Sequence, residues 1–312
     1  MKKYINFILF KILNFISPII RIWESILIKK YSVLPLKHEP VFIVGAPRTG
    51  STILYQVLTN ELDSIYINNL TCKFFRNSFF GMWLSSKFYR YKAHNTFNSK
   101  YGDTNGLNSP SECGQFWYRW LPKDIYFLKA SDIKDEIRNE IRDEVTAIIN
   151  YHDKPLIIKN LGMGQRLDLL KDVFPNAKII YIDRNPILTA QSILKARLKQ
   201  DYPENKIWSI KPKNYLILES YSLHSQIIGQ IYYLQKQILE DLGKFSNTFQ
   251  LNYSDLNDKI KLISCKKFIT SKNRDNYEDS VINNKEKLTL NLNEINILES
   301  EIKKYDWTNY DK

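Results

Sequence analysis

Val-Phe-Ile-Val-Gly-Ala-Pro-Arg-Thr-Gly-Ser-Thr, residues 41–52, is the stretch of this 312-residue chain that decides its fold. The apolar run at residues 41–44 has the composition of a buried strand, and a helical pattern begins at Ser51. The loop between them is bounded by Gly45 and Gly50. A strand, a glycine-bounded loop and a helix start together form a cradle for a phosphate-like anion, because backbone N–H groups and the positive helix end point into the loop.

The loop departs from a nucleotide-triphosphatase loop at one position. The spacing from Gly45 to Gly50 matches a Walker A motif, but Ser51 stands where the lysine of that motif is required. The cation lies inside the loop instead, at Arg48. A planar guanidinium binds oxyanions through two parallel hydrogen bonds, so the substitution favours an oxyanion ligand of another kind. A strand-turn-helix with incidental glycines is the alternative interpretation.

A second strand and helix follow the same plan. Residues 177–182 have the composition of a buried strand, and a helical pattern runs from Ile187 to Lys199. Between them, Asn185 is a favourable N-cap and Pro186 a favourable first helical residue. Arg184 therefore lies at the carboxyl end of a strand, where open α/β sheets bind ligands, and Ser192 follows eight residues later. An isolated helix serine is usually only solvated, but the combination with the first loop favours a ligand site.

The two stretches together resemble the sulfotransferases that use 3′-phosphoadenosine-5′-phosphosulfate (PAPS). In that family a Pro-Arg-x-Gly-Ser/Thr-Thr loop holds the 5′-phosphosulfate, and an Arg and a Ser eight residues apart hold the 3′-phosphate. The resemblance covers about residues 39–256, and the segment from residue 157 to 186 is similar to the bacterial and tyrosylprotein/carbohydrate branch. It implies PAPS as co-substrate, bound by Arg48, Thr49, Gly50, Ser51, Thr52, Arg184, Ser192 and Tyr253. The match at Tyr253 is partial, because Ser254 stands where the family has a glutamate.

The resemblance also implies three catalytic residues: Glu112, Lys159 and Arg48. The family branch carries a glutamate in a Ser-Pro-x-Glu element, and a carboxylate there can accept the proton of the acceptor hydroxyl. Lys159 matches a lysine that neutralises the leaving phosphate oxygen, although a structural salt bridge is an alternative. Glu112 has an alternative too, since Ser109-x-x-Glu112 is also a capping box for a helix running to Trp120. His94 and His152 are the other candidate bases.

Length, charge and cysteines narrow the class of protein. A chain of 312 residues suits one large α/β domain or at most two. The net charge of +12 indicates an anionic partner. Cys72, Cys113 and Cys265 are odd in number and widely spaced, which argues against a disulfide framework or zinc site and for a reducing compartment. The four histidines show no metal-ligand spacing, so we expect no metal.

Strands that alternate with helices predict an α/β fold of three layers, with a central parallel sheet flanked by helices as in P-loop proteins. The expected further strands are residues 64–67, 156–159 and 248–251, and the expected helices are residues 51–62, 109–120, 132–152, 165–173, 187–199 and 214–242. We expect residues 1–38 to form an amphipathic helical segment and linker, and residues 39–312 to form the sulfotransferase domain. Residues 64–108, basic and aromatic, are expected to be an acceptor-side or membrane-facing insert rather than a nucleic-acid site; a solvated surface segment is the alternative.

The first 28 residues carry apolar side chains at helical spacing, with lysines on both flanks. No run of about 20 uninterrupted apolar residues occurs, which argues against a membrane span. Lys11 interrupts the apolar region and disfavours a cleaved signal peptide. Two interpretations stay open: a helix lying on an anionic membrane with a kink at Pro18, or a helix docked on its own domain. The first would make the protein cytoplasmic and peripheral on the inner face of the membrane.

Three function classes follow from these observations. The first is sulfuryl transfer from PAPS to a hydroxyl acceptor, with a glycan or glycolipid favoured by the basic-aromatic insert. The second is a P-loop nucleotide kinase or triphosphatase, since residues 179–183 mimic a Walker B strand; Ser51 and Arg184 argue against it. The third is a non-enzymatic protein that binds membranes or polyanions. Such a protein would be a sulfotransferase-like fold that has lost its active site. The chain has kept Arg48, Lys159, Arg184 and Ser192 together, which argues against that loss.

Overall fold

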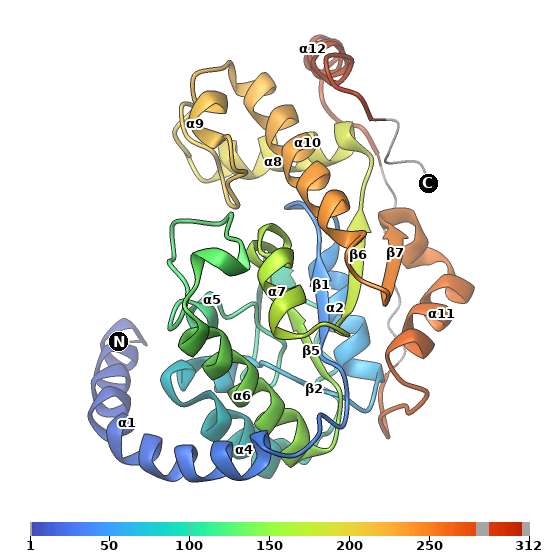
Figure 1. The fold of residues 1–312 in the computed structure, drawn as a ribbon. Helices are drawn as coiled ribbons and strands as arrows, with labels where there is room; N and C mark the ends of the chain where they lie inside the picture. The colour runs from blue at the N-terminus through green and yellow to red at the C-terminus, as the bar shows by residue number, and fades with distance from the viewer. Residues whose placement is uncertain (1, 101, 279–286, 308–312) are drawn as a thin grey trace.

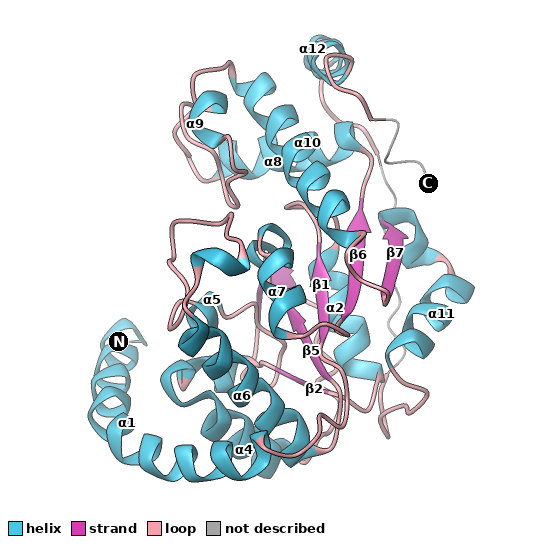
Figure 2. Cartoon of the chain, viewed as in Figure 1, coloured by secondary structure: helices cyan, strands magenta, loops and turns pink. Residues whose placement is uncertain are grey.

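A parallel five-stranded sheet forms the centre of the molecule (Figure 1). The computed structural model describes residues 2–100, 102–278 and 287–307, with the side chains of residues 2–10 and 12–14 left undescribed. The strand order is β2-β5-β1-β6-β7. The strands are β1 Val41–Val44, β2 Ile65–Tyr66, β5 Leu156–Lys159, β6 Lys178–Asp183 and β7 Thr248–Asn252. All four neighbouring pairs are parallel, so the carboxyl ends of the strands share one edge, toward which the arrowheads of β6 and β7 point in Figure 2.

Alternate residues of each strand are buried on opposite faces of the sheet, as the period of two requires. On one face, Phe42 and Val44 of β1 pack with α6 Asp135–His152 and α7 Leu167–Val173. On the other face, Val41 and Ile43 pack with α2 Ser51–Glu61 and α11 Lys259–Ile269. The predicted three-layer α/β fold with a central parallel sheet is confirmed.

Most predicted elements occur within a few residues of their expected bounds, but one helix is divided. The segment expected as one helix over residues 214–242 forms α9 Tyr215–Leu218 and α10 Leu223–Leu242. Ser222 is extended (φ −61°, ψ 156°) and caps the start of α10. The side-chain amide of Gln226 donates to the carbonyls of Glu219 and Tyr221, which stabilises the break. Gln226 is buried, so the break belongs to the core.

A third apolar cluster lies where α8 Pro186–Lys199, α10 and α12 Leu292–Ile302 pack together. The beginning of α8 agrees with the sequence, because Asn185 accepts from the amide of Ile187 and Pro186 is the first helical residue. The C-terminal region, from which the sequence predicts only solvated helices and turns, contributes α11 to the core and α12 to this cluster. Its residues 279–286 and 308–312 lie outside the described residues.

Residues 64–108, the expected insert, contain β2 and after it a compact set of short elements. They are α3 Asn69–Lys73, the 3₁₀ turn η1 Phe75–Asn77, α4 Ser78–Tyr89 and the hairpin strands β3 Ser99–Lys100 and β4 Asp103–Thr104. Tyr101 lies outside the described residues. Asn68 caps α3 by accepting from the amide of Thr71 at 2.8 Å. The insert is therefore an ordered part of the domain rather than a loop.

The prediction that the cysteines form no disulfide is wrong for two of them. Cys72 in α3 and Cys113 are disulfide-bonded, with Cα atoms 5.6 Å apart. They are 41 residues apart in sequence, and the spacing rules for short motifs do not detect such a pair. The argument for a reducing compartment loses its basis with this bond. Cys265, the third cysteine, is a buried thiol on α11.

The first helix, α1 Lys2–Ser32, passes along the outside of α6 and α4 and curves visibly, with Pro18 inside it (Figure 1). Its inner face is docked, because Glu24 is fully buried and accepts from the side chain of Asn77 and the amide of Phe79. Its outer face exposes Phe15, Ile19, Ile22 and Ile26 at 64–83% of their surface. The side chains from Ile5 to Leu13 in the predicted stripe lie outside the described part. Among the described residues, no helix is long and apolar enough to cross a membrane.

Candidate active site

A cavity of about 630 Å³ opens at the edge of the sheet where β1, β5 and β6 end. Its lining includes Pro47, Arg48 and residues 50–53 after β1, Ser99, Gly102, Asp103 and Thr104 of a hairpin, the segment from Ser111 to Gln115, and Lys159, Arg184 and Tyr253. The lining thus comes from segments far apart in the chain. The predicted binding edge of the sheet is where the cavity lies.

The loop after β1 owes its shape to two glycines. Gly50 has φ +89° and caps the start of α2 in the left-handed region. A Cβ at Gly50 would lie 2.5 Å from the ring of Tyr253, and one at Gly45 would lie 2.4 Å from the carbonyl oxygen of Ile182. The glycines therefore let the loop lie against β6 and Tyr253. The first amides of α2 have no acceptor within the helix and point to this end of the sheet, where an anion would be favoured.

Two arginines bring positive charge to this loop. Arg48 has φ +70°, and its Nε donates to the hydroxyl of Ser192 at 2.9 Å. Arg184 donates to the carbonyl oxygen of Arg48 at 3.2 Å and stacks on the ring of Tyr253, with Cζ 4.1 Å from the centroid. Arg48, Arg184, Ser192 and Tyr253, which are predicted to bind one ligand, therefore form one connected group.

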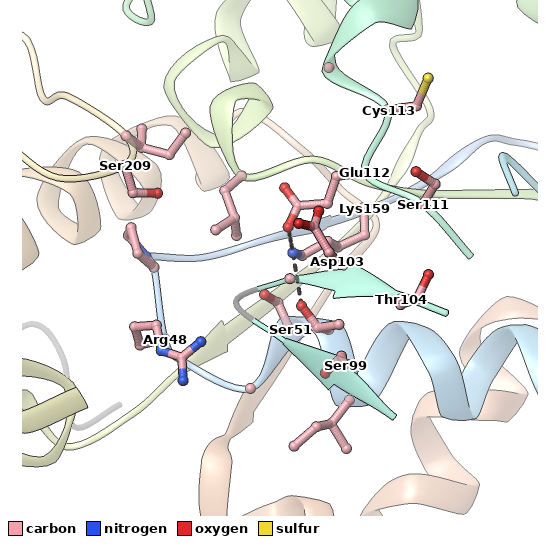
Figure 3. A pocket seen from close by; sticks show the side chains of 18 of the residues that line it. Arg48, Ser51, Ser99, Asp103, Thr104, Ser111, Glu112, Cys113, Lys159 and Ser209 are labelled. Carbon is pink, nitrogen blue, oxygen red and sulfur yellow. Dashed lines mark hydrogen bonds and ion pairs between the residues drawn. The ribbon is translucent and has the colours of Figure 1, made fainter. Parts of the chain in front are cut away.

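Lys159 and Glu112 meet at the centre of the cavity (Figure 3). The Nζ of Lys159 is ion-paired with Oε1 of Glu112 and donates to the hydroxyl of Thr52 at 3.1 Å. Lys159 is 1% exposed, whereas the side chain of Glu112 is 31% exposed and lines the cavity. Burial of an ammonium group is costly without a partner, so Glu112 and Thr52 stabilise the lysine at the strand end.

The capping-box interpretation of Glu112 is wrong. The helix in this region, α5 Gly114–Trp117, begins only after Glu112 and is four residues long. The hydroxyl of Ser109 donates to the carbonyl oxygen of Asn105 instead of capping a helix. A Pro at position 110 and the left-handed conformation of Cys113 (φ 36°) keep residues 109–113 out of a helical path. Glu112 therefore points into the cavity, where it meets Lys159.

Two predicted binding residues lie beside the cavity rather than on its wall. Thr49 is fully buried, and its hydroxyl donates to the carbonyl oxygen of Ala46 at 2.9 Å. Its side chain therefore stabilises the loop from behind. Ser192 lies one contact away, behind Arg48. Gly50, Ser51, Thr52, Arg184 and Tyr253 are on the wall itself, as are the three predicted catalytic residues Arg48, Glu112 and Lys159.

The other candidate bases are away from the cavity wall. His94 is held by Gln56 and Thr96, and burial lowers its pKa to about 4. The Nδ1 atom of His152 is hydrogen-bonded to the hydroxyl of Tyr91, and burial lowers the pKa of His152 to about 3. Behind the site, burial raises the pKa of Tyr55 well above its usual value, so its phenol stays protonated. Glu112 is the carboxylate that the geometry brings together with a cation at the cavity centre.

Several residues of the cavity wall belong to no motif from which the sequence could have predicted them. Trp208, Ser209 and Ile210 reach the cavity from the segment between α8 and α9, which Gln230 holds by donating to the carbonyls of Trp208 and Ile210. Asn69, Asp103, Thr104 and Gln115 line the opposite side. The absence of acidic residues before Asp103 in the insert is the one sequence feature that marks this side as unusual.

The described residues hold no cluster of three or more His, Cys, Asp or Glu side chains suited to a metal ion. Asp183, the residue that mimics a Walker B carboxylate, is engaged in the scaffold. Its Oδ1 accepts from the amide of Arg184 at 2.6 Å and from the side chain of Gln235.

Comparison with known proteins gives a family match. The profile of the Sulfotransferase family matches residues 40–215, more than half of the chain. A search of curated proteins finds no match. Among solved structures, a sulfotransferase from Mycobacterium avium is 13% identical with TM-score 0.47, the alignment covering 75% of this chain and 64% of that one. One from Mycobacterium tuberculosis H37Rv is 16% identical with TM-score 0.45, covering 86% and 77%. One from Alicyclobacillus acidocaldarius is 14% identical with TM-score 0.44, covering 86% and 92%.

Proposed function

The chain belongs to the sulfotransferase family, and from this premise we propose that it transfers a sulfuryl group from PAPS to a hydroxyl of a glycan or glycolipid. The observation that carries the proposal is the meeting of a glycine-bounded loop, three cations and the carboxylate paired with Lys159 in a single cavity: Gly50, Arg48, Lys159, Arg184 and Glu112. Membership of the family implies a sulfonate donor and a hydroxyl-bearing acceptor. PAPS, the acceptor class and the roles of individual residues are the proposal.

The donor side of the cavity suits an adenosine carrying two anionic groups. The amides of loop 48–52 and the guanidinium of Arg48 would hold the 5′-phosphosulfate. Arg184 and Ser192 would hold the 3′-phosphate, and Tyr253, stacked beneath Arg184, borders the same space. Three cations in one cavity offset the charge of such a polyanion, which supports the fit.

The catalytic roles follow from charge. Glu112 accepts the proton of the acceptor hydroxyl as the new oxygen–sulfur bond forms. Lys159 stabilises the negative charge that grows on the phosphate oxygen as its bond to sulfur breaks. Glu112 and Lys159 are ion-paired with each other, so both are close enough to act on the same sulfuryl group during its transfer. Arg48 neutralises the transferring group, and the protein supplies positioning rather than covalent chemistry.

The kinase or triphosphatase alternative is weaker on two observations. Ser51 occupies the lysine position of the loop. Asp183, which would hold a magnesium-bound water, accepts from Gln235 and from its neighbouring amide and is not on the cavity wall.

The acceptor side of the cavity is polar without being cationic, apart from Lys159. Its wall carries amide, hydroxyl and carboxylate groups from Asn69, Ser99, Asp103, Thr104, Ser111 and Gln115. Such groups exchange hydrogen bonds with several hydroxyls of one ligand, as a sugar requires. This lining supports a glycan or glycolipid acceptor.

The outer face of α1 supports a membrane surface as a partner. Phe15, Ile19, Ile22 and Ile26 form one exposed stripe, with exposed Lys11, Lys29 and Lys30 on the same helix. An apolar stripe flanked by lysines binds the interface of an anionic membrane. The docked inner face and the outer stripe make the two interpretations of this segment compatible. Its division from residues 39–312 stays a prediction.

The test of the donor site is calorimetry with 3′,5′-bisphosphoadenosine (PAP) and 5′-AMP. Each charge-assisted bond to the 3′-phosphate is worth about 1.5–3 kcal/mol, so PAP should bind at least about tenfold more tightly. Arg184→Ala should remove the preference, while Lys199→Ala at the exposed end of α8 should keep it. Equal affinity of the wild-type protein for both nucleotides would refute the donor assignment.

Transfer itself is tested with labelled PAPS and three acceptors: octyl β-D-glucopyranoside, a soluble neutral oligosaccharide and 4-nitrophenol. Label on either sugar without added Mg²⁺ is the expected result. Label on 4-nitrophenol alone would contradict the glycan assignment but keep the transferase, whereas Mg²⁺-dependent release of phosphate from ATP would favour the alternative.

Membrane binding is tested with vesicles of phosphatidylcholine containing phosphatidylglycerol. Ile19→Asp with Ile22→Asp should lower binding at least about tenfold, because both side chains would be lost from the interface. Ile260→Asp on α11 is the matched control, since Ile260 is 77% exposed but lies outside the stripe. Point changes are preferable to deletion, which would uncover the buried Glu144 that α1 contacts through Arg21. Unchanged binding by the double variant would leave α1 as a docked helix only.

A further inference from the structure

The disulfide between Cys72 and Cys113 lies in the wall of the cavity, and both cysteines line it. Cys72 belongs to α3, and Cys113 directly follows Glu112. The bond therefore joins the insert to the segment that carries the proposed base. Figure 3 shows Cys113 and Glu112 on one irregular segment of the chain, with the hairpin facing this segment.

On the Cys72 side, α3 and the hairpin are one connected unit. The side-chain amide of Asn69 in α3 donates to the carbonyls of Thr104 and Gly106, at 3.0 and 2.8 Å. The hairpin in turn lies against the base, because a Cβ at Gly102 would be 3.0 Å from Oε1 of Glu112. Glu112 is thus bordered by the hairpin on one side and followed by the disulfide on the other.

On the Cys113 side, the backbone is in a conformation that needs support. Its φ of 36° lies in the left-handed region, which is unfavourable for a residue with a Cβ. The bond to Cys72 and the packing of Cys113 in the core, where it is 4% exposed, hold this conformation. Without the bond the residue could relax toward negative φ and move Glu112, its neighbour.

We infer that the Cys72–Cys113 bond is a thiol–disulfide exchange site whose state sets the position of Glu112, so that a dithiol reductant converts the enzyme into a slower form. The inference rests on the proposed role of Glu112, whose regulation it describes. The donor side is unaffected, because Arg48, Arg184 and Tyr253 extend from the carboxyl ends of β1, β6 and β7.

A dithiol reduces the Cys72–Cys113 bond in two exchange steps. One thiolate attacks the sulfur of Cys72, which is half-buried and the more accessible of the two, and Cys113 leaves as a thiolate that takes up a proton. The second thiol of the reductant attacks the mixed disulfide and releases Cys72 as a thiol. Two electrons and two protons reach the protein, and the reductant leaves as a cyclic disulfide.

Cys265 provides an internal reference. It is fully buried on α11, and burial raises the pKa of its thiol to about 12. Thiolate is the reactive form, so Cys265 should neither exchange nor be alkylated in the folded protein.

The experiment equilibrates the full chain in mixtures of reduced and oxidised dithiothreitol, followed by alkylation and peptide mass spectrometry. Cys72 and Cys113 should gain label together with one midpoint, while Cys265 stays unlabelled. In the reduced protein, hydrogen exchange of residues 109–117 should rise about tenfold. PAP affinity should change less than about twofold, and PAP formation from PAPS with octyl β-D-glucopyranoside should fall about tenfold and recover on re-oxidation.

Variants separate regulation from simple stability. Cys72→Ser with Cys113→Ser should behave as the reduced protein in every buffer, and Cys265→Ser should titrate as the wild type. Equal hydrogen exchange of residues 109–117 in the two redox states would overturn the inference, as would an unchanged rate. Should the double variant fail to fold, the wild-type titration alone decides. Absence of turnover in both states would refute the proposed function, while the exchange of residues 109–117 would still test the switch.

Discussion

At the scale of single residues, the ion pair between Lys159 and Glu112 defines the candidate site. The sequence predicts the place of Lys159, because a polar residue that ends a run of buried strand residues must lie at the sheet edge. It does not predict the partner, which comes 47 residues earlier in an irregular segment. Spacing rules describe neighbours within one element, so for Glu112 they suggest only a helix cap, which is the alternative to the predicted catalytic role. The tertiary contact overrides that local rule.

Glu112→Gln should reduce sulfuryl transfer to a sugar hydroxyl at least about a hundredfold. The amide keeps the size and hydrogen-bonding capacity of the carboxylate but not its basicity. The penalty should be smaller with 4-nitrophenol, whose proton leaves more easily. Steady-state rates with both acceptors check this, with PAP affinity as control. An equal loss with both would make Glu112 a counter-ion of Lys159 rather than a base.

Lys159→Ala should lower kcat for transfer by at least about a hundredfold while changing PAP affinity only slightly, because charge grows on the leaving oxygen only during transfer. The variant should remain folded: the cavity opens to solvent beside the removed ammonium group, and Glu112 is 31% exposed and can be hydrated. Thermal melting provides the control. A raised KM for PAPS with preserved kcat would instead make the lysine a binding residue.

At the scale of elements, the strand-loop-helix units were predictable and the connections between them were not. Periodicity located β1, β5, β6 and α8, because their burial depends on local pattern. The break between α9 and α10 depends on Gln226, whose partners are backbone carbonyls of the turn itself. The disulfide joins segments 41 residues apart, and the four-residue α5 begins directly after Cys113 of that bond. Such features follow from the fold, so a single sequence does not reveal them.

Gly50→Ala should weaken PAP binding about tenfold or more and destabilise the fold by about 1–3 kcal/mol. The new Cβ would meet the ring of Tyr253 at 2.5 Å and would require a left-handed backbone with φ +89°. Gly243→Ala, at the end of α10, is the matched control, since its φ is −58° and its nearest neighbour is 3.8 Å away. Calorimetry and thermal melting of both variants check this. A Gly50→Ala protein with unchanged affinity would show that the loop tolerates displacement of Tyr253.

At the scale of the whole molecule, the cationic side chains behind the net charge of +12 include some that line the cavity and others that form buried ion pairs. Arg48, Lys159 and Arg184 lie at the cavity, whereas Arg21 and Arg119 pair with the buried Glu144 under α1. Net charge therefore predicted an anionic partner without saying which cations meet it. The imidazoles have a different role: His152 is buried and His94 is half-buried, and their lowered pKa values keep both neutral at pH 7.

The stability of the whole fold should fall when pH drops below about 6.5, because His94 and His152 resist protonation in the folded protein. Burial lowers their pKa to about 4 and about 3, from an ordinary value of 6.5. Below pH 6.5 the unfolded chain therefore binds protons that the folded chain does not, and the free energy of unfolding decreases by about 1.4 kcal/mol per pH unit for each histidine. The loss continues down to each folded pKa and then stops.

Chemical denaturation at pH 7.0, 6.0 and 5.0 measures this dependence. Between pH 6.5 and 5.0 each histidine should lower the free energy of unfolding by about 2 kcal/mol. The variant His152→Gln should lessen this loss by that amount, although it lacks the hydrogen bond between His152 and Tyr91 and starts from a lower stability. His94→Asn should act likewise and independently, since the two contact different elements. His38→Gln, at a half-exposed surface position beside Asp153, is the control for removing an imidazole. If His152→Gln kept the full pH dependence of the wild type, His152 would have to accept its proton inside the fold. The protonated ring would then keep a hydrogen bond between Nδ1 and the hydroxyl of Tyr91.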